Sequence, residues 1–192
     1  MNPKVKNIKI KNLSDDWYTL DKVNFDYQMT NGTWVNQNRE VYDKGNGAAI
    51  LLYNTIQRTV ILTKQFRMPT YKDGHEDGMM IEVPAGLLDG DEPEVCIKKE
   101  VLEETGYAID QVEKVLTLYS SPGAISEKIT YFIAAYTPKM KVASGGGVET
   151  ETEDIEVLEM DFDQAITMIQ NNKIIDVKTV VLLQYALINK LF

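Results

Sequence analysis

At residues 86–106 the chain reads GLLDGDEPEVCIKKEVLEETG, a stretch in which carboxylates cluster between two glycine turns. If its second half is a helix, Glu100, Glu103 and Glu104 stand at positions i, i+3 and i+4 and share one helix face. Like charges at this spacing repel each other by about 0.2–0.5 kcal/mol per pair on an exposed helix. A hard divalent cation, which takes carboxylate and carbonyl oxygens as ligands, would turn this repulsion into attraction. The cluster therefore predicts a metal site.

Local signals favour the helix. Asp91 can cap its N-terminus, with Glu94 at the third helical position in a capping-box pattern. Pro93 stands in the first turn, where its missing N–H does no harm, and Gly106 follows the last turn, where a left-handed residue is expected. We predict a helix of about a dozen residues. Its apolar side chains are expected to lie away from the glutamates and to pack on a sheet: Val95, Val101 and Leu102.

The alternative to a metal site is a solvated acidic helix, partly neutralised by Lys98 and Lys99. The spacing, however, resembles the Nudix box, in which Gly, five residues, Glu and seven residues precede Arg-Glu-apolar-x-Glu-Glu-x-Gly-apolar. Residues 99–107 match its second half with Lys99 in place of Arg, and the interval that follows Glu92 is one residue shorter. Five fixed residues over nine positions are far more specific than a lone glycine motif.

This resemblance implies a bound divalent ion, Mg²⁺ or Mn²⁺, with Glu103 supporting the cluster. The ion would offset charge on a pyrophosphate and lower the pKa of a bound water. A backbone oxygen that precedes a glycine can approach an ion closely, although an ordinary turn at Ala85 needs no metal. The ligands implied by the resemblance are the Ala85 carbonyl, Glu100, Glu104 and Glu153.

Two loops outside the box carry further carboxylates. Residues 145–154 read GGGVETETED. The three glycines would let this loop move, and Glu151 and Glu153 follow them. On composition the loop is equally a solvated surface segment, but it resembles the Glu-x-Glu-Asp-Ile loop of the ADP-ribose and GDP-mannose branch of the Nudix hydrolases. Residues 121–127, SPGAISE, are similar to a second segment of that branch, or form a capped turn. The resemblance implies that Glu127 or Glu151 positions or deprotonates the attacking water.

The same branch implies contacts to a nucleotide sugar. Arg67 ends a predicted strand, and its planar guanidinium suits phosphate, although a lone arginine or lysine is more often a solvated charge. Residues around Arg39 would reach the nucleotide of a partner subunit. Trp17 has two possible roles, stacking on a base or packing at a dimer contact. The expected substrate contacts are Trp17, Asn38, Arg39, Glu40, Arg67, Gly86, Leu87, Glu127 and Lys178.

Composition agrees with a soluble enzyme. The 192 residues are 44% hydrophobic, enough for one globular domain with an appendage, and the net charge of −9 argues against nucleic acid as a partner. No apolar run approaches the roughly 20 residues that span a bilayer, and the first residues do not resemble a signal peptide. The single cysteine, Cys96, excludes an internal disulfide. We expect a cytoplasmic protein with no membrane partner, in which Cys96 packs in a helix interface.

The pattern of elements predicts an α/β fold, and the resemblance makes it a Nudix α/β/α sandwich with a mixed sheet. Residues 1–45 are predicted to form a small N-terminal β extension whose exposed edges favour a homodimer, with coverage of its own domain as the alternative. Residues 46–192 would form the Nudix hydrolase domain. The predicted strands are 7–11, 17–29, 34–42, 48–53, 59–65, 79–83, 112–119, 129–136 and 155–160, and the later helices are one that Asp161 or Asp163 caps, ending at Gln170, and 177–190.

The resemblance extends from residue 13 to the last helix. It implies magnesium-dependent hydrolysis of the pyrophosphate bond of GDP-mannose, giving GMP and mannose 1-phosphate. ADP-ribose, which would give AMP and ribose 5-phosphate, is the alternative substrate. A hypothesis from another class is a nucleotide-sensing module without turnover, because the box is shortened and carries Lys99.

Overall fold

A computed structural model describes residues 4–148 and 152–192 of the chain. The chain divides into two compact units, and each is described by itself. The first comprises Met1–Asn46 with Tyr119–Lys128, and the second comprises Gly47–Leu118 with Ile129–Phe192. The segment 119–128, which carries the predicted Glu127, therefore belongs to the N-terminal unit. The sequence had not predicted this.

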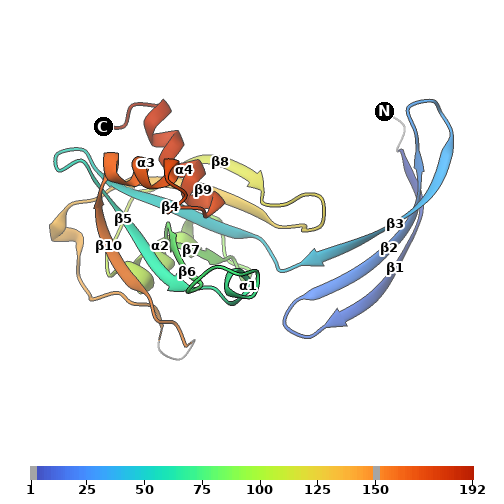
Figure 1. The fold of residues 1–192 in the computed structure, drawn as a ribbon, viewed down its shortest axis with the longest axis horizontal. Coiled ribbons are helices and arrows are strands. Elements are labelled where there is room, and N and C mark those ends of the chain that lie inside the picture. The colour runs from blue at the N-terminus through green and yellow to red at the C-terminus, as the bar shows by residue number, and fades with distance from the viewer. Residues whose placement is uncertain (1–3, 149–151) are drawn as a thin grey trace. The chain divides into compact units, whose positions relative to one another are not determined.

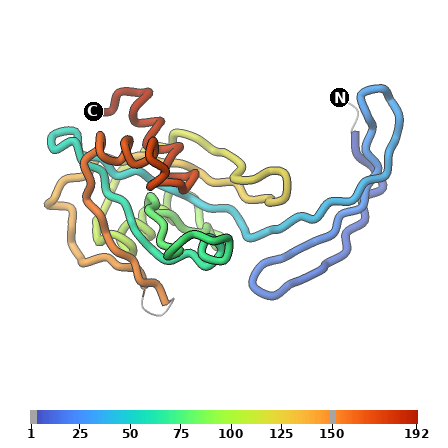
Figure 2. Tube along the Cα trace, in the orientation of Figure 1, coloured from blue at the N-terminus to red at the C-terminus, as the bar shows by residue number. Residues whose placement is uncertain are grey.

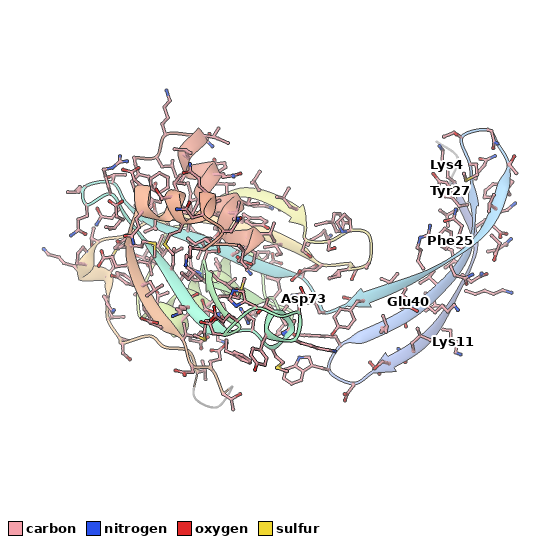
Figure 3. All side chains as sticks on the ribbon, in the orientation of Figure 1. Lys4, Lys11, Phe25, Tyr27, Glu40 and Asp73 are labelled. Carbon is pink, nitrogen blue, oxygen red and sulfur yellow. The ribbon has the colours of Figure 1, made fainter. Side chains whose placement is uncertain are left out.

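The first unit is a three-stranded antiparallel sheet of β1 (Val5–Asp15), β2 (Thr19–Gln28) and β3 (Trp34–Asp43), in that order. Figure 2 shows the meander in blue. The predicted hairpin turn lies between β2 and β3, with Gly32 in the left-handed region. No described residue from 4 to 46 is buried, and the side chains of this sheet, with Phe25 and Tyr27 among them, stand off the strands in Figure 3.

The second unit contains a mixed sheet in the order β10-β5-β4-β9-β8, in which β4 and β9 are parallel. Two short strands add to it, since β6 pairs with β5 and β7 pairs with β4. The central strand β4 has buried residues pointing to both faces, as expected for a strand covered on two sides. The bounds are β4 (Gly47–Asn54), β5 (Thr59–Phe66), β6 (Met79–Glu82), β7 (Ala85–Leu87), β8 (Glu113–Tyr119), β9 (Lys128–Ala135) and β10 (Glu156–Asp161).

Helices cover both faces of this sheet and make it a sandwich, as Figure 1 shows. On one face Ala49 and Leu51 of β4 pack with α3 (Phe162–Gln170) and α4 (Val177–Ile188). On the other face Ala48, Ile50 and Leu52 pack with α2 (Pro93–Thr105). Side chains that alternate along one strand thus feed two separate cores. The expectation of an α/β sandwich with a mixed sheet and an N-terminal β extension is confirmed.

Every predicted strand and helix is present, with ends that move by a few residues. The largest change is β1, predicted over 7–11 and observed over Val5–Asp15, because its many lysines and asparagines hide the strand pattern. Among the residues that the structure describes, the prediction missed three short elements: α1 (Met68–Lys72), β7 and the 3₁₀ turn Pro138–Met140. Elements of three to five residues are too short to show a periodicity. Within the described residues, no helix is long and apolar enough to cross a membrane.

Candidate active site

The helix that carries the glutamate cluster is α2. It ends as predicted, because Gly106 adopts the left-handed conformation with a φ of 77° and donates its N–H to the Leu102 carbonyl. The predicted start was wrong in one respect. The N-cap is Glu92, without a side-chain hydrogen bond, so Asp91 does not cap the helix. Pro93 as the first helical residue lowers the number of free N–H groups that a cap would satisfy.

The buried face of α2 differs from the predicted one. Val95 and Leu102 are 58% and 41% exposed, whereas Ile97 and Val101 are fully buried. Glu104 follows them at the same helical spacing and is only 2% exposed. The prediction that Val95, Val101 and Leu102 pack on the sheet is therefore right for Val101 and wrong for Val95 and Leu102. The buried stripe of α2 ends in the carboxylate of Glu104.

Glu104 is an acid in an unfavourable environment. Its burial, followed by the negative charge of Glu100, raises its pKa well above the usual value, and Glu153 adds to the effect. The N–H of Ala85 opposes the shift by donating a hydrogen bond of 3.2 Å to Glu104 Oε2. This bond fixes the carboxylate of Glu104 beside the turn whose carbonyl was predicted to bind metal. A cation at this place would relieve the repulsion.

The glycine after Ala85 is required by close packing. A Cβ at Gly86 would overlap the carboxylate of Glu100, so only a glycine lets that side chain lie against the strand. Residues 85–87 form β7, which pairs with residues 47–49 of β4 and is thereby fixed on the sheet. The structure therefore brings Ala85, Gly86, Glu100 and Glu104 together, as the sequence predicted.

A small acidic pocket opens beside these residues. Its volume is about 70 Å³, room for a hydrated ion or a few waters. Lys99 and Glu103 on its wall form an ion pair of 3.6 Å, one helical turn apart. Among the described residues, no group of three or more His, Cys, Asp or Glu side chains is placed so that it could hold a metal ion. The lining consists of Leu87, Leu88, Asp89, Asp91, Cys96, Lys99, Glu100, Glu103, Val148 and Glu153.

The glycine triplet docks the second acidic loop onto the end of α2. Gly146 N–H donates to the Glu104 carbonyl at 2.9 Å, and Gly147 N–H donates to the Glu103 carbonyl at 3.1 Å. A Cβ at Gly145 would collide with the backbone of residues 104–106. The following N–H, of Val148, donates to Glu153 Oε2 at 3.0 Å and holds this carboxylate at the pocket. The glycines thus provide close backbone contact here, and Glu151 lies outside the described residues.

A second charged group lies along β6 and the start of α4. Glu82 is 2% exposed, and its two oxygens accept bonds from Arg67 Nε at 2.7 Å and Nη2 at 3.0 Å. Lys178 Nζ donates to the same carboxylate at 3.0 Å and to Asp176 at 2.8 Å. The hydroxyl of Thr179 donates to Asp176 and accepts from the Val83 N–H at 2.7 Å. Two predicted substrate contacts, Arg67 and Lys178, are therefore neighbours on one carboxylate.

The remaining predicted residues belong to the first unit. Glu127 is 6% exposed and forms an ion pair of 2.6 Å with Lys44. Trp17 is 84% exposed, which leaves both of its predicted roles open. The other three lie on β3, where Arg39 donates hydrogen bonds to the Asn38 carbonyl and to the Gln37 side chain. These substrate contacts, namely Trp17, Asn38, Arg39, Glu40 and Glu127, stay predictions.

Sequence reasoning missed several residues of the second unit that line the acidic pocket or belong to the charged group around Glu82: Glu82, Asp176, Thr179, Asp89 and Asp91. Asp176 had a local signal, because an aspartate three residues before a threonine is typical of a helix N-cap, and it does cap α4. Glu82 had none, since its partners lie 15 and 96 residues away along the chain. Pairing over such distances is visible only in the fold.

Comparison with known proteins gives the family. A family model described as "GDP-mannose pyrophosphatase NudK N-terminal domain" matches residues 4–42, and one described as "NUDIX domain" matches residues 43–180. A GDP-mannose pyrophosphatase of Salmonella arizonae is 51% identical over 185 residues, which are 96% of each chain. Proteins of the same name in Yersinia pestis (strain Pestoides F) and Escherichia coli O9:H4 are 50% and 51% identical, over 98% and 96% of this chain and 94% and 96% of theirs. The chain therefore belongs to the NUDIX family, with an N-terminal domain of the NudK type ahead of the NUDIX domain.

Proposed function

We propose that the protein is a GDP-mannose pyrophosphatase, which hydrolyses the bridge between the two phosphates and gives GMP and mannose 1-phosphate. The observation that carries the proposal is the identity of 50–51% with GDP-mannose pyrophosphatases over nearly the whole chain. A NUDIX domain alone would not select a substrate, because one fold hosts many activities. The match of residues 4–42 to the NudK N-terminal domain favours GDP-mannose over ADP-ribose.

NUDIX hydrolases generally use divalent metal ions, and the donors of this site fit a hard cation. Its side-chain donors are carboxylate oxygens, and buried Glu104 lies among like charges that a cation would offset. Mg²⁺, which is usually held by a few carboxylates and substrate phosphates, is the proposed ion, and Mn²⁺ accepts the same donors. The residues that would hold it are Glu100, Glu104, Glu153 and the Ala85 carbonyl.

The reaction adds the oxygen of water to one phosphorus and breaks its bond to the bridging oxygen, which leaves with the other phosphate. Held by Glu100, Glu104, Glu153 and the Ala85 carbonyl, a divalent ion would offset the charge of the pyrophosphate and favour ionisation of the attacking water. A carboxylate, Glu127 or Glu151, takes the proton of that water. The ion pair with Lys44 orients Glu127, and Glu103 is oriented by Lys99.

Arg67 and Lys178 are proposed to contact the phosphates. Both side chains are cationic, and they share the carboxylate of Glu82. Two neighbouring cations match a diphosphate, whose two groups carry adjacent negative charges. The arginine offers a planar pair of donors, whereas the lysine acts as a point charge.

We also propose that the protein is a homodimer whose N-terminal sheets pair. Three strands need a buried face to be stable, yet no described residue from 4 to 46 is buried within one chain. Large apolar side chains are instead exposed on this sheet, which is typical of a surface that packs against a partner. They are Val5, Ile8, Ile10, Leu13, Trp34 and Val35.

A cytoplasmic location is proposed from the cysteine. Cys96 is a free thiol, 3% exposed, in the core under α2. Its burial, followed by the charge of Glu100, raises its pKa to about 11, so the thiol packs and does not react. A protein with one buried thiol and no disulfide suits a reducing compartment.

The proposal is tested by turnover of GDP-mannose and ADP-ribose at equal magnesium concentration. We expect GDP-mannose to be preferred and Glu104→Gln to lower kcat/KM for it by about 100-fold or more, because the amide removes a charged metal ligand. Glutamine keeps the shape and the acceptor for Ala85 N–H, so this variant should fold. Glu94→Gln, which changes an exposed carboxylate on the same helix, is the control and should retain activity.

Three outcomes would contradict the proposal. A strong preference for ADP-ribose would overturn the assignment of the substrate. Full activity of Glu104→Gln, measured as initial rate of GMP release, would overturn the metal site. Binding of GDP-mannose by the parent protein without turnover would favour the sensing module.

A further inference from the structure

Glu82 is a buried negative charge between two cations that the proposed function uses. It is the last residue of β6, and its backbone is fixed because Thr63 Oγ1 donates to its carbonyl at 3.2 Å. Its side chain is 3% exposed, whereas the side chains of Arg67 and Lys178 are 42% and 18% exposed. The carboxylate is therefore more deeply buried than either of the two cations that bind it.

The geometry of the contacts fixes both cations. Arg67 binds in the forked mode, with Nε on one oxygen of Glu82 and Nη2 on the other, which sets the plane of the guanidinium. Lys178 Nζ shares the second oxygen at 3.0 Å. One oxygen thus contacts a nitrogen from each cation, and this keeps the two cations side by side despite their repulsion.

Neither cation is used up by these bonds. Glu82 engages two of the five N–H groups of Arg67, and Lys178 spends two of its three on Glu82 and Asp176. Burying a carboxylate costs free energy unless the carboxylate is paired. If this position served only to pack the core, an apolar side chain would fill it without that cost.

The group is also connected to the predicted metal site. Thr179, next to Lys178, accepts the Val83 N–H, and Glu104 accepts the Ala85 N–H two residues farther along. The backbone from Glu82 to Ala85 is therefore held on one side by α4 and on the other by α2. A displacement of Glu82 would therefore move both the two cations and the backbone at Ala85.

We propose that Glu82 is a positioning residue that presents Arg67 and Lys178 as a matched pair to the two phosphates of the substrate. The inference rests on the proposed function, in which these cations contact the pyrophosphate. It goes further by making their separation, set by one carboxylate, a determinant of diphosphate recognition. The competing explanation is a structural ion pair that only fastens α4 to β6.

The test uses inorganic pyrophosphate as the probe, at fixed magnesium concentration, with calorimetry on the full-length protein and its Glu82→Gln variant. We expect the affinity to fall by about tenfold or more, because the amide cannot hold two cations as a carboxylate does. Loss of one negative charge would by itself attract an anion more strongly. Weaker binding therefore reports displaced cations, and equal or tighter binding overturns the proposal.

A second variant and a control keep the test decisive if Glu82→Gln folds poorly. Glu82→Asp keeps the charge but withdraws it by one methylene, and we expect about tenfold weaker pyrophosphate binding with folding retained. Unchanged affinity in this variant overturns the proposal, even if its melting temperature falls. Glu159→Gln, which removes a carboxylate that accepts from Tyr136 on the same sheet, should bind pyrophosphate as the parent does.

The same titration separates this inference from the proposed function. Pyrophosphate has no base and no sugar, so its binding depends on the cations whatever the natural substrate is. If the parent does not hydrolyse GDP-mannose but Glu82→Gln still loses pyrophosphate affinity, the proposed function fails and the role of Glu82 stands. If GDP-mannose is hydrolysed equally by parent and variant, with the same KM, the role of Glu82 fails alone.

Discussion

Two buried acids of the second unit have pKa values displaced in opposite directions. Burial and the charge of Glu100 raise the pKa of Glu104. Burial also acts to raise the pKa of Glu82, but the hydrogen bonds and charges of Arg67 and Lys178 outweigh it and lower the pKa. The difference lies in where the counter-charge comes from. The fold supplies cations to Glu82, whereas Glu104 sits among like charges and suits a cation from solution.

A pH dependence of stability follows for Glu82. Because its pKa in the folded protein is below its usual value of 4.5, its ion pairs stabilise the fold above that pH. This contribution is lost as the pH falls through the lowered pKa. Urea unfolding of the parent and Glu82→Gln should give a gap in the free energy of unfolding that is full at neutral pH and closes in acid. A gap that is constant with pH would contradict the ion-pair account.

At the scale of elements, the site depends on how the loop after the 3₁₀ turn docks on α2. Three successive N–H groups, of Gly146, Gly147 and Val148, donate to the Glu104 carbonyl, the Glu103 carbonyl and the Glu153 side chain. The helix end is thereby capped by the loop that brings the next carboxylate. Residues 146–148 and Glu153 are therefore fixed to the C-terminal end of α2.

Gly145→Ala should disrupt the docking of this loop on α2. The added methyl would meet the backbone of residues 104–106, and the φ of 72° is unfavourable for alanine, so we expect a loss of about 2 kcal/mol or more in the free energy of unfolding. GDP-mannose turnover should fall with it. Gly123→Ala is the control for stability, because its φ is ordinary and nothing lies within 4 Å of the added methyl. Equal denaturation midpoints for the two variants would show that the close contact at Gly145 does not affect stability.

Most of the elements could be predicted from the sequence, because their periodicity is local. The strands of the sandwich have local apolar patterns, and the helices α2, α3 and α4 have glycine or aspartate boundaries. Residues of the box were predicted to lie together for the same reason, since helical spacing places Glu100 and Glu104 on one side. The resemblance to a family supplied Ala85 and Glu153, which local rules would not have selected.

The rest depended on contacts between distant segments. Val95 and Leu102 were placed in the core and are exposed, because the position of the sheet under α2 decides which stripe is buried. Glu82 was passed over because its partners come from β5 and α4. The affiliation of residues 119–128 with the N-terminal unit was equally invisible, since it arises from contacts of Tyr42 with Ala124 and Ser126.

At the scale of the whole molecule, the N-terminal sheet is the part in which no described residue is buried within one chain. Its three strands carry exposed apolar side chains on a framework of many lysines, asparagines and aspartates. Hydrogen bonds between strands alone do not stabilise a small sheet in water. The proposed homodimer would supply the missing buried surface.

A pair of single substitutions on β1 tests this surface. Ile10 is 66% exposed and its neighbour Lys11 points to the opposite face, because side chains alternate along a strand. We expect Ile10→Asn to weaken dimerisation by about tenfold or more, measured by sedimentation equilibrium, since it removes a buried isoleucine from the interface. Lys11→Asn should leave the association constant nearly unchanged. A parent protein that sediments as a monomer at every concentration would contradict the dimer.

The absence of any buried residue from 4 to 46 also bears on how the protein would respond to heat. If that sheet gains its interior from a second chain, its melting is a bimolecular equilibrium governed by mass action. The melting temperature of the sheet would then rise with protein concentration, whereas the covered sandwich would melt at a temperature independent of dilution. Calorimetry would then show two transitions, and only the one from the N-terminal sheet would shift to lower temperature on dilution. Such a pair would indicate that this sheet is completed by a second chain.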